Sequence, residues 1–333
     1  MRRNLLAAAL ALAVSTTAAA QAVPQPVEQA AREIAAELAK QCPLAPANDT
    51  AAYDACRRGL FASQALRARL PAILLWGRES KAPGATLRTT HLTQFAPDVW
   101  TNMYVPLFMF NGRYTLEWVA EERLYRMRLE AAFRNRLAPG QFPYPFWHEE
   151  AKWATYENAN AVTLWIAPDT QLLRAAQFTD IAPTPRLQAV TPVKHAKHDG
   201  QWVWTDAQGR TQPAVTLFDG VLRPDNPYIH AMDRQYRDLA LQMRESQCSQ
   251  CHVPNNPEKM SRLVLLSTPA HAAGEIDRLI KSVRDDRMPV DEFRNTVPLS
   301  PDQKRWLLES AEAFRASWRQ AQAWERERTK EAP

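Results

Sequence analysis

Glycine is scarce in this chain, and its scarcity limits the kinds of site that the chain can build. Only 9 of its 333 residues are glycine, whereas 25 are proline. This balance predicts many fixed turns and long ordered connections. Glycine-rich nucleotide sites are excluded, because the sequence has neither a P-loop nor a dinucleotide-binding fingerprint. A nucleophile elbow and a zincin helix are also missing.

The chain also lacks a strong excess of either charge. Its formal net charge is +5, and loss of Arg2 and Arg3 with the leader described below would leave +3. Such a small and mixed charge does not favour nucleic acid or a membrane surface as a partner. The apolar run Tyr104–Phe110 is much shorter than the roughly 20 residues that cross a bilayer. We therefore expect no nucleic-acid partner and no integral membrane segment after signal cleavage.

The first residues, 1–22, have the order of a secretory signal peptide. Arg2 and Arg3 give a short positive region, and an apolar run of leucine, alanine and valine follows over Leu5–Val14. Ala20-Gln21-Ala22 then fits a cleavage site of small residues, although cleavage after Ala20 is an alternative. We expect an exported, periplasmic protein.

Two of the four cysteines lie near the start of the mature chain. Cys42 and Cys56 are fourteen positions apart, and each lies near a helix-like stretch. In an oxidising compartment this arrangement favours a disulfide that joins two helices, worth ~3 kcal/mol by loop closure. Two separate buried thiols are the alternative.

The other two cysteines belong to the pentapeptide Cys248-Ser249-Gln250-Cys251-His252. This is a C-x-x-C-H sequence, the attachment signature of c-type haem. The two thiols can form thioether bonds to one porphyrin, and His252 can ligate its iron. A thioredoxin-like dithiol would need a preceding strand, and zinc would need two further ligands, of which His271 could supply only one. The motif therefore predicts one covalently bound haem c per chain.

The segment around this motif resembles a class I c-type cytochrome over residues 226–320. A helical stripe leads into Cys248, Met288-Pro289 lies downstream, and Ser300 and Gln303 form a capping box before a last amphipathic helix. The stripe consists of Met232, Tyr236, Leu239 and Met243.

The resemblance implies thioether bonds at Cys248 and Cys251, proximal ligation by His252 and distal ligation of the iron by Met288. Met260, His271 or no protein ligand remain alternatives to Met288. The chain departs from the family at 253–257, where proline and asparagine stand in place of the glycines common after the motif.

The first two thirds of the chain match no family that the motifs identify. Helices are expected over 26–41, 50–69 and 116–137, and strands over 162–166 and 172–178. A hairpin is expected from strands at 201–205 and 213–218. The expected fold is α+β overall, with a mainly helical N-terminal domain that carries a small antiparallel sheet and an all-α, cytochrome c-like C-terminal domain. The expected units are the leader 1–22, an α+β domain of unknown role at 23–225, the haem domain at 226–320 and a charged tail at 321–333.

Together these features predict a periplasmic single-haem protein that transfers single electrons to and from redox partner proteins. Two alternatives remain. One is a haem-containing oxidoreductase whose N-terminal domain binds the substrate. The other is a haem-based sensor with an open distal site.

Overall fold

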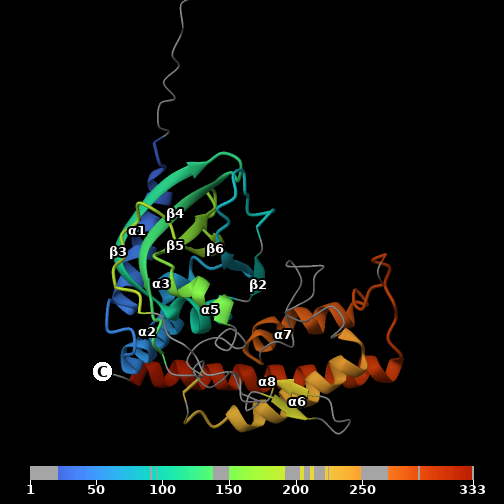
Figure 1. Cartoon of the computed structure of the whole chain (residues 1–333). Helices are drawn as coiled ribbons and strands as arrows, with labels where there is room; N and C mark the ends of the chain where they lie inside the picture. The colour runs from blue at the N-terminus through green and yellow to red at the C-terminus, as the bar shows by residue number, and fades with distance from the viewer. Residues whose placement is uncertain are drawn as a thin grey trace, which may run out of the picture.

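A computed structural model gives the architecture of the chain (Figure 1). It describes residues 22–90, 92–95, 97–137, 150–191, 203–205, 211–213, 222–223, 225–248, 269–291 and 293–331. The expected signal peptide therefore lies outside the described residues, apart from its last residue, Ala22. Cys251, His252 and Met260 lie outside them as well.

The centre of the fold is a six-stranded sheet with the strand order β2-β1-β6-β5-β4-β3. Strand β1 runs parallel to β6, while the other neighbouring pairs are antiparallel, so the sheet is mixed. A separate two-stranded pairing, β7 with β8, confirms a hairpin around residue 206, but its second strand is Thr211–Pro213 and not 213–218 as expected. The strands are β1 (Leu74–Arg78), β2 (Thr93–Phe95), β3 (Phe108–Val119), β4 (Leu124–Phe133), β5 (Ala161–Ile166), β6 (Leu173–Thr179), β7 (Val203–Thr205) and β8 (Thr211–Pro213).

The helix expected over 116–137 is wrong, because this segment forms most of the long β3–β4 hairpin. Arg123 has a φ of 55° in the turn between the strands. Along β4, buried Tyr125, Met127 and Leu129 alternate with partly exposed arginines. This period of two places the apolar residues on the core face of the sheet. The prediction of a mainly helical N-terminal domain with a small antiparallel sheet is therefore also wrong.

Helices cover the core face of this sheet, and α1 packs on β3 and β4. Val27, Ile34 and Leu38 of α1 are fully or almost fully buried. A disulfide joins Cys42 to Cys56, as expected, and so links the end of α1 to α2. The N-terminal helices and helical turns are α1 (Gln25–Gln41), α2 (Thr50–Ala62), α3 (Gln64–Arg67), α4 (Pro97–Val99), η1 (Trp100–Tyr104), η2 (Val105–Leu107) and α5 (Glu150–Glu157).

Aromatic side chains fill the space between the sheet and its covering helices. Tyr156 stacks on Phe178 with 3.9 Å between ring centroids. The indole Nε1 of Trp76 donates to the hydroxyl of Tyr156 at 3.2 Å. Burial raises the pKa of this tyrosine, so its hydroxyl stays neutral and can accept that bond.

The last third of the described chain consists of α6 (Ile229–Glu245), α7 (Pro269–Arg284) and α8 (Pro301–Glu331). Helices α6 and α7 lie along the 31-residue α8 (Figure 1). Their buried residues belong to the same continuous apolar core as the sheet. Near its C-terminal end, α8 lies beside α2, where the Arg326 guanidinium sits 5.6 Å from the Phe61 ring centroid.

The prediction of an all-α, cytochrome c-like C-terminal domain is therefore wrong. These helices share their core with the mixed sheet and do not form a clear all-α cytochrome fold. At a coarser level the chain is α+β, as expected. Among the described residues, no helix is both long enough and apolar enough to span a bilayer.

Candidate functional site

Helix α6 leads directly into the C-x-x-C-H motif. Met232, Leu239 and Met243 are buried on the face that the sequence predicted, and they hold the helix against the core. The helix ends at Glu245, and Gln247 takes a left-handed φ of 63°. A left-handed residue after the last turn is a common way to end a helix. Cys248 follows this turn and lies half-buried against the main core.

Helix α6 runs antiparallel to α8, and this orientation fixes the level of Cys248. Near the start of α6, the Asn226 amide donates to the carbonyl of Ala321 at 3.1 Å. Further along, the rings of Tyr236 and Phe314 lie 6.0 Å apart. Both helices rise by about 1.5 Å per residue. If the pairing of α6 with α8 is extended beyond Tyr236 and Phe314 at this rise, Cys248 lies level with the first turn of α8.

Helix α7 is also antiparallel to α8, and its ion pairs give the register. Asp277 accepts from Arg319 at 3.0 Å, and Arg284 donates to Glu312 at 2.8 Å. Beyond the end of α7, Lys304 of α8 contacts the Asp286 carboxylate at 2.6 Å. The loop that carries Met288 therefore begins beside the first turn of α8. Cys248 and Met288 thus lie at the same end of the three-helix layer.

The Met288 loop has its own hydrogen-bond network. The Asp291 carboxylate accepts from the backbone N–H groups of Phe293 at 2.9 Å and Asn295 at 2.8 Å. The Asn295 side-chain amide also donates to Asp291, and these hydrogen bonds lower the pKa of its carboxyl group. An antiparallel bridge between Val290 and Thr296 closes the loop. The loop is therefore ordered without a helix or a strand of its own.

Four large exposed apolar side chains belong to this loop and to the start of α8. Met288 is 40% exposed, Phe293 77%, Val297 45% and Trp306 46%. They are four of the five large hydrophobic residues that are exposed in the described parts of the chain, the fifth being Leu44. Scattered exposed hydrophobic residues are normal, whereas a local group of them marks an interaction or ligand-binding surface. We call Met288, Phe293, Val297 and Trp306 the apolar end group.

The sequence predicted Met288 but missed the other three members of the apolar end group. Trp306 lies next to Leu307, which belongs to the buried stripe of α8, so the helical period alone does not mark it as exposed. Phe293 and Val297 are apolar residues in a polar loop, a signal that could have been used. Among the alternative ligands, His271 lies in the first turn of α7.

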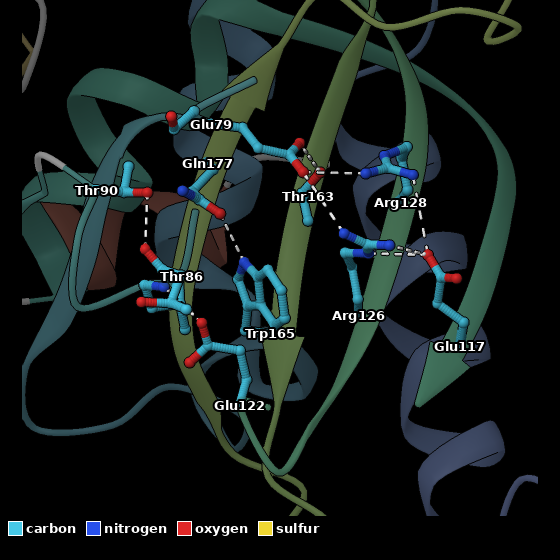
Figure 2. Close-up of polar contacts among 12 residues, drawn as sticks. Glu79, Thr86, Thr90, Glu117, Glu122, Arg126, Arg128, Thr163, Trp165 and Gln177 are labelled. Carbon is cyan, nitrogen blue, oxygen red and sulfur yellow. Dashed lines mark hydrogen bonds and ion pairs between the residues drawn. The ribbon is translucent and has the colours of Figure 1, made fainter. Parts of the chain in front are cut away.

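A group of charged residues lies on the face of the sheet opposite to the core (Figure 2). The Glu79 carboxylate contacts Arg128 at 3.0 Å and accepts from the Thr163 hydroxyl at 3.1 Å. Glu117 accepts from Arg126 at 2.8 Å, and the two residues are directly opposite in the β3–β4 register. Glu117 and Arg126 pair across the neighbouring strands β3 and β4, whereas Glu79, directly after β1, reaches across β6 and β5 to Arg128 of β4. We interpret this group as a structural network rather than a ligand site.

Within the parts of the chain that the structure describes, no three His, Cys, Asp or Glu side chains converge to hold a metal ion. Comparisons with protein-family models, with curated proteins and with solved structures found no match to this chain.

Proposed function

We propose that the chain carries one covalently attached haem c and transfers single electrons. Cys248 and Cys251 would hold the porphyrin through thioether bonds, while His252 and Met288 would be the axial ligands of the iron. The register of the three helices carries the proposal beyond the motif. Continued from the contacts of α6 and α7 with α8, it brings the half-buried Cys248 and the start of the Met288 loop to the same end of the three-helix layer.

The apolar end group fits a porphyrin in its chemistry. A porphyrin has broad apolar faces, and cofactor sites are lined mainly by hydrophobic and aromatic side chains. Phe293, Val297 and Trp306 would lose contact with water if a planar apolar group covered them, which is favourable by about 25 cal/mol per Å² buried. Without such a cover these large side chains remain in water on a surface otherwise rich in charge.

Each protein group has a distinct task at this site. The buried stripe of α6 fixes the position of Cys248, and the Asp291 network fixes the loop that carries Met288. When bound, haem iron held by histidine and methionine cycles between ferrous and ferric states, and the soft thioether raises its reduction potential. Two axial protein ligands leave no open position on the iron, which favours a carrier over a catalyst.

The register of the helices supports Met288 over His271 as the distal ligand. His271 lies 13 residues before Arg284 in α7, which corresponds to about 20 Å along the helix axis. It is thus at the end of α7 opposite to the Met288 loop and to the level of Cys248. Met260, outside the described residues, is the alternative that the variants below test.

A periplasmic location belongs to the same proposal. The leader over residues 1–22 has the order of a secretory signal, and the buried Cys42–Cys56 disulfide suits an oxidising compartment. Bacteria attach haem c outside the cytoplasm. The predicted export signal is therefore consistent with the predicted haem attachment. The electrons would pass to and from redox partner proteins.

A redox titration with a ligand-binding assay tests the proposed role. The protein is produced with a c-type maturation system, and its absorption is followed during reduction and reoxidation. We expect a reversible one-electron change and slow binding of carbon monoxide by the ferrous protein. Rapid carbon monoxide binding by the untreated protein would instead favour a sensor or a catalyst with an open iron position.

A further inference from the structure

A cavity of about 420 Å³ lies where the sheet meets the C-terminal helices. One wall consists of Ala72 and Ile73, directly before β1, and the others come from the middle of α7 and of α8. Its volume is within the roughly 300–1,000 Å³ that is typical of sites for small organic ligands, and such sites are often found between structural units. The size and place of this cavity therefore suit a small organic ligand.

Apolar side chains from all three elements line this cavity. Ile73 lies on the side of the sheet, Ile276 on α7 and Trp318 on α8. Ile276 is 1% exposed and Trp318 is 6% exposed, and both belong to the main core. The core thus holds these side chains in place, and an indole ring offers a large rigid contact area to an apolar ligand.

Two carboxylates and three guanidinium groups also line the cavity. Glu275, which is 2% exposed, accepts from Arg278 at 3.4 Å, so this pair adds no net charge. The other charged residues of the lining are Asp277, Arg315 and Arg319. They comprise one carboxylate and two guanidinium groups, so the described lining has an excess of one positive charge.

The neighbouring charges do not cancel this excess. Asp277 is shared, because it accepts from Arg315 at 3.3 Å and from Arg319 at 3.0 Å. Arg315 also contacts Glu312, but the other carboxylate oxygen of Glu312 accepts from Arg284 at 2.8 Å. These contacts join three guanidinium groups to two carboxylates, so the local excess of one positive charge remains.

Arg319 has donors that a ligand can use. Its contacts with Asp277 involve only the Nη2 atom, which leaves Nε and Nη1 without a hydrogen bond to the described residues. The Arg319 side chain is 60% exposed and that of Arg315 is 25% exposed, so this part of the cavity is open to solvent. A planar guanidinium can hold a carboxylate through two parallel N–H···O bonds.

We propose that this cavity binds a small monocarboxylate with an apolar body, such as an aromatic or branched aliphatic acid. The carboxylate binds Arg319 at the solvent side, and the apolar body lies against Ile73, Ile276 and Trp318. The bound acid links the sheet to α7 and α8.

The acid site is separate from the proposed haem site. Arg319 lies 15 residues after Lys304, whose ammonium group contacts Asp286 at the start of the Met288 loop. This separation corresponds to about 22 Å along α8. The acid site therefore does not depend on haem attachment, and either proposal can fail without the other.

Calorimetric titration of the full mature protein with phenylacetate tests the proposal. Phenylacetamide has the same apolar body without the charge, and acetate has the charge without the body. At neutral pH and equal ionic strength, we expect phenylacetate to bind at least about tenfold more tightly than either. Equal affinity for phenylacetate and phenylacetamide, or no binding of phenylacetate, contradicts the proposal.

Arg319→Gln is the informative variant, and Arg305→Gln is its matched control on the same helix. Arg305 pairs with Asp302 and is not part of the described lining. Both arginine side chains are more than half exposed, so neither change should unfold the protein. We expect Arg319→Gln to weaken phenylacetate binding about tenfold and Arg305→Gln to leave it unchanged. Equal affinities of the two variants would remove Arg319 from the site and overturn the proposal.

Crystals of the mature protein with 4-bromophenylacetate locate the site. We expect an anomalous bromine peak beside Ile73, Ile276 and Trp318, with the carboxylate within hydrogen-bond distance of Arg319. A bromine peak only at the apolar end group or elsewhere on the surface would overturn the proposal. A cavity that holds only water, or a segment of the chain itself, would also overturn it.

Discussion

At the scale of single residues, substitution of Met288 tests the proposed distal ligand of the haem. Its side chain is 40% exposed, so Met288→Ala should cost little stability, of the order of 0.5 kcal/mol. We expect the variant to lose the methionine-to-iron charge-transfer band of the ferric protein and to show a lower reduction potential, because the soft thioether favours ferrous iron. Absorption spectra and potentiometry measure both effects.

Met260→Ala is the matched variant for this comparison, since it removes the alternative methionine from the same half of the chain. It should keep the charge-transfer band. A band that persists in Met288→Ala and disappears in Met260→Ala would show that the distal ligand has been assigned to the wrong residue.

Glu79 is the residue on which the charged network of the sheet depends (Figure 2). Its side chain is 13% exposed, and Glu79→Gln would leave the nearly buried Arg128 without its closest acid. We expect the free energy of unfolding to fall by about 1–3 kcal/mol, as for other buried groups that lose a partner. Glu117→Gln, at a half-exposed carboxylate, should cost at most about 1 kcal/mol in the same urea titrations. Equal losses would contradict the structural role given to Glu79.

At the scale of elements, the sequence predicted some segments well and misread others for identifiable physical reasons. Helices at 26–41 and 50–69 were found because their apolar positions repeat with a helical period, although Ser63 separates α2 from α3. The capping box was also correct: Ser300 and Gln303 each accept the other's backbone N–H at 3.2 Å.

The sequence of the β3–β4 hairpin favours a helix locally, because Leu, Ala, Glu and Arg are good helix formers and some apolar residues also have helical spacing. The strict alternation from Tyr125 onward was the stronger signal. Charged side chains are compatible with these strands because Glu117 and Arg126 pair across the sheet. The parallel pairing of β1 with β6 joins segments about 100 residues apart in the sequence. The periodicity of apolar residues within either segment does not predict which distant strand pairs with it.

The Met288 loop should depend on pH through Asp291. Hydrogen bonds from Asn295 and Phe293 lower the pKa of this carboxyl group in the folded loop. Its stabilising effect is therefore complete above the unfolded pKa of about 3.9 and is lost as the pH falls through the lower, folded value. We expect the methionine-to-iron band to weaken in this acidic range.

Asp291→Ala should weaken the band already at neutral pH, since it removes the acceptor of two backbone N–H groups. Asp302→Asn is the control, because its carboxylate pairs with Arg305 on the surface of α8 and not with the loop. An identical acid titration of the band in wild type and Asp291→Ala would show that Asp291 does not hold the loop.

At the scale of the whole molecule, the sheet and the C-terminal helices share one core, so they should unfold together. The Arg326–Phe61 contact and the packing of α2 on α8 connect the two ends of the chain. We expect a single urea transition, with the same midpoint for haem absorption and for far-UV circular dichroism. Two transitions with separate midpoints would show that the helices around Cys248 fold independently of the sheet.

The central claim is that this chain carries one haem through Cys248 and Cys251, and the intact mass of the denatured mature protein tests it most directly. The account predicts a mass equal to the chain after removal of residues 1–22, or 1–20, less the hydrogens lost in the Cys42–Cys56 disulfide, plus one haem. In the double variant Cys248→Ala and Cys251→Ala, the haem mass should be absent after denaturation. Wild-type protein made with the c-type maturation system that shows no covalent haem would contradict the account.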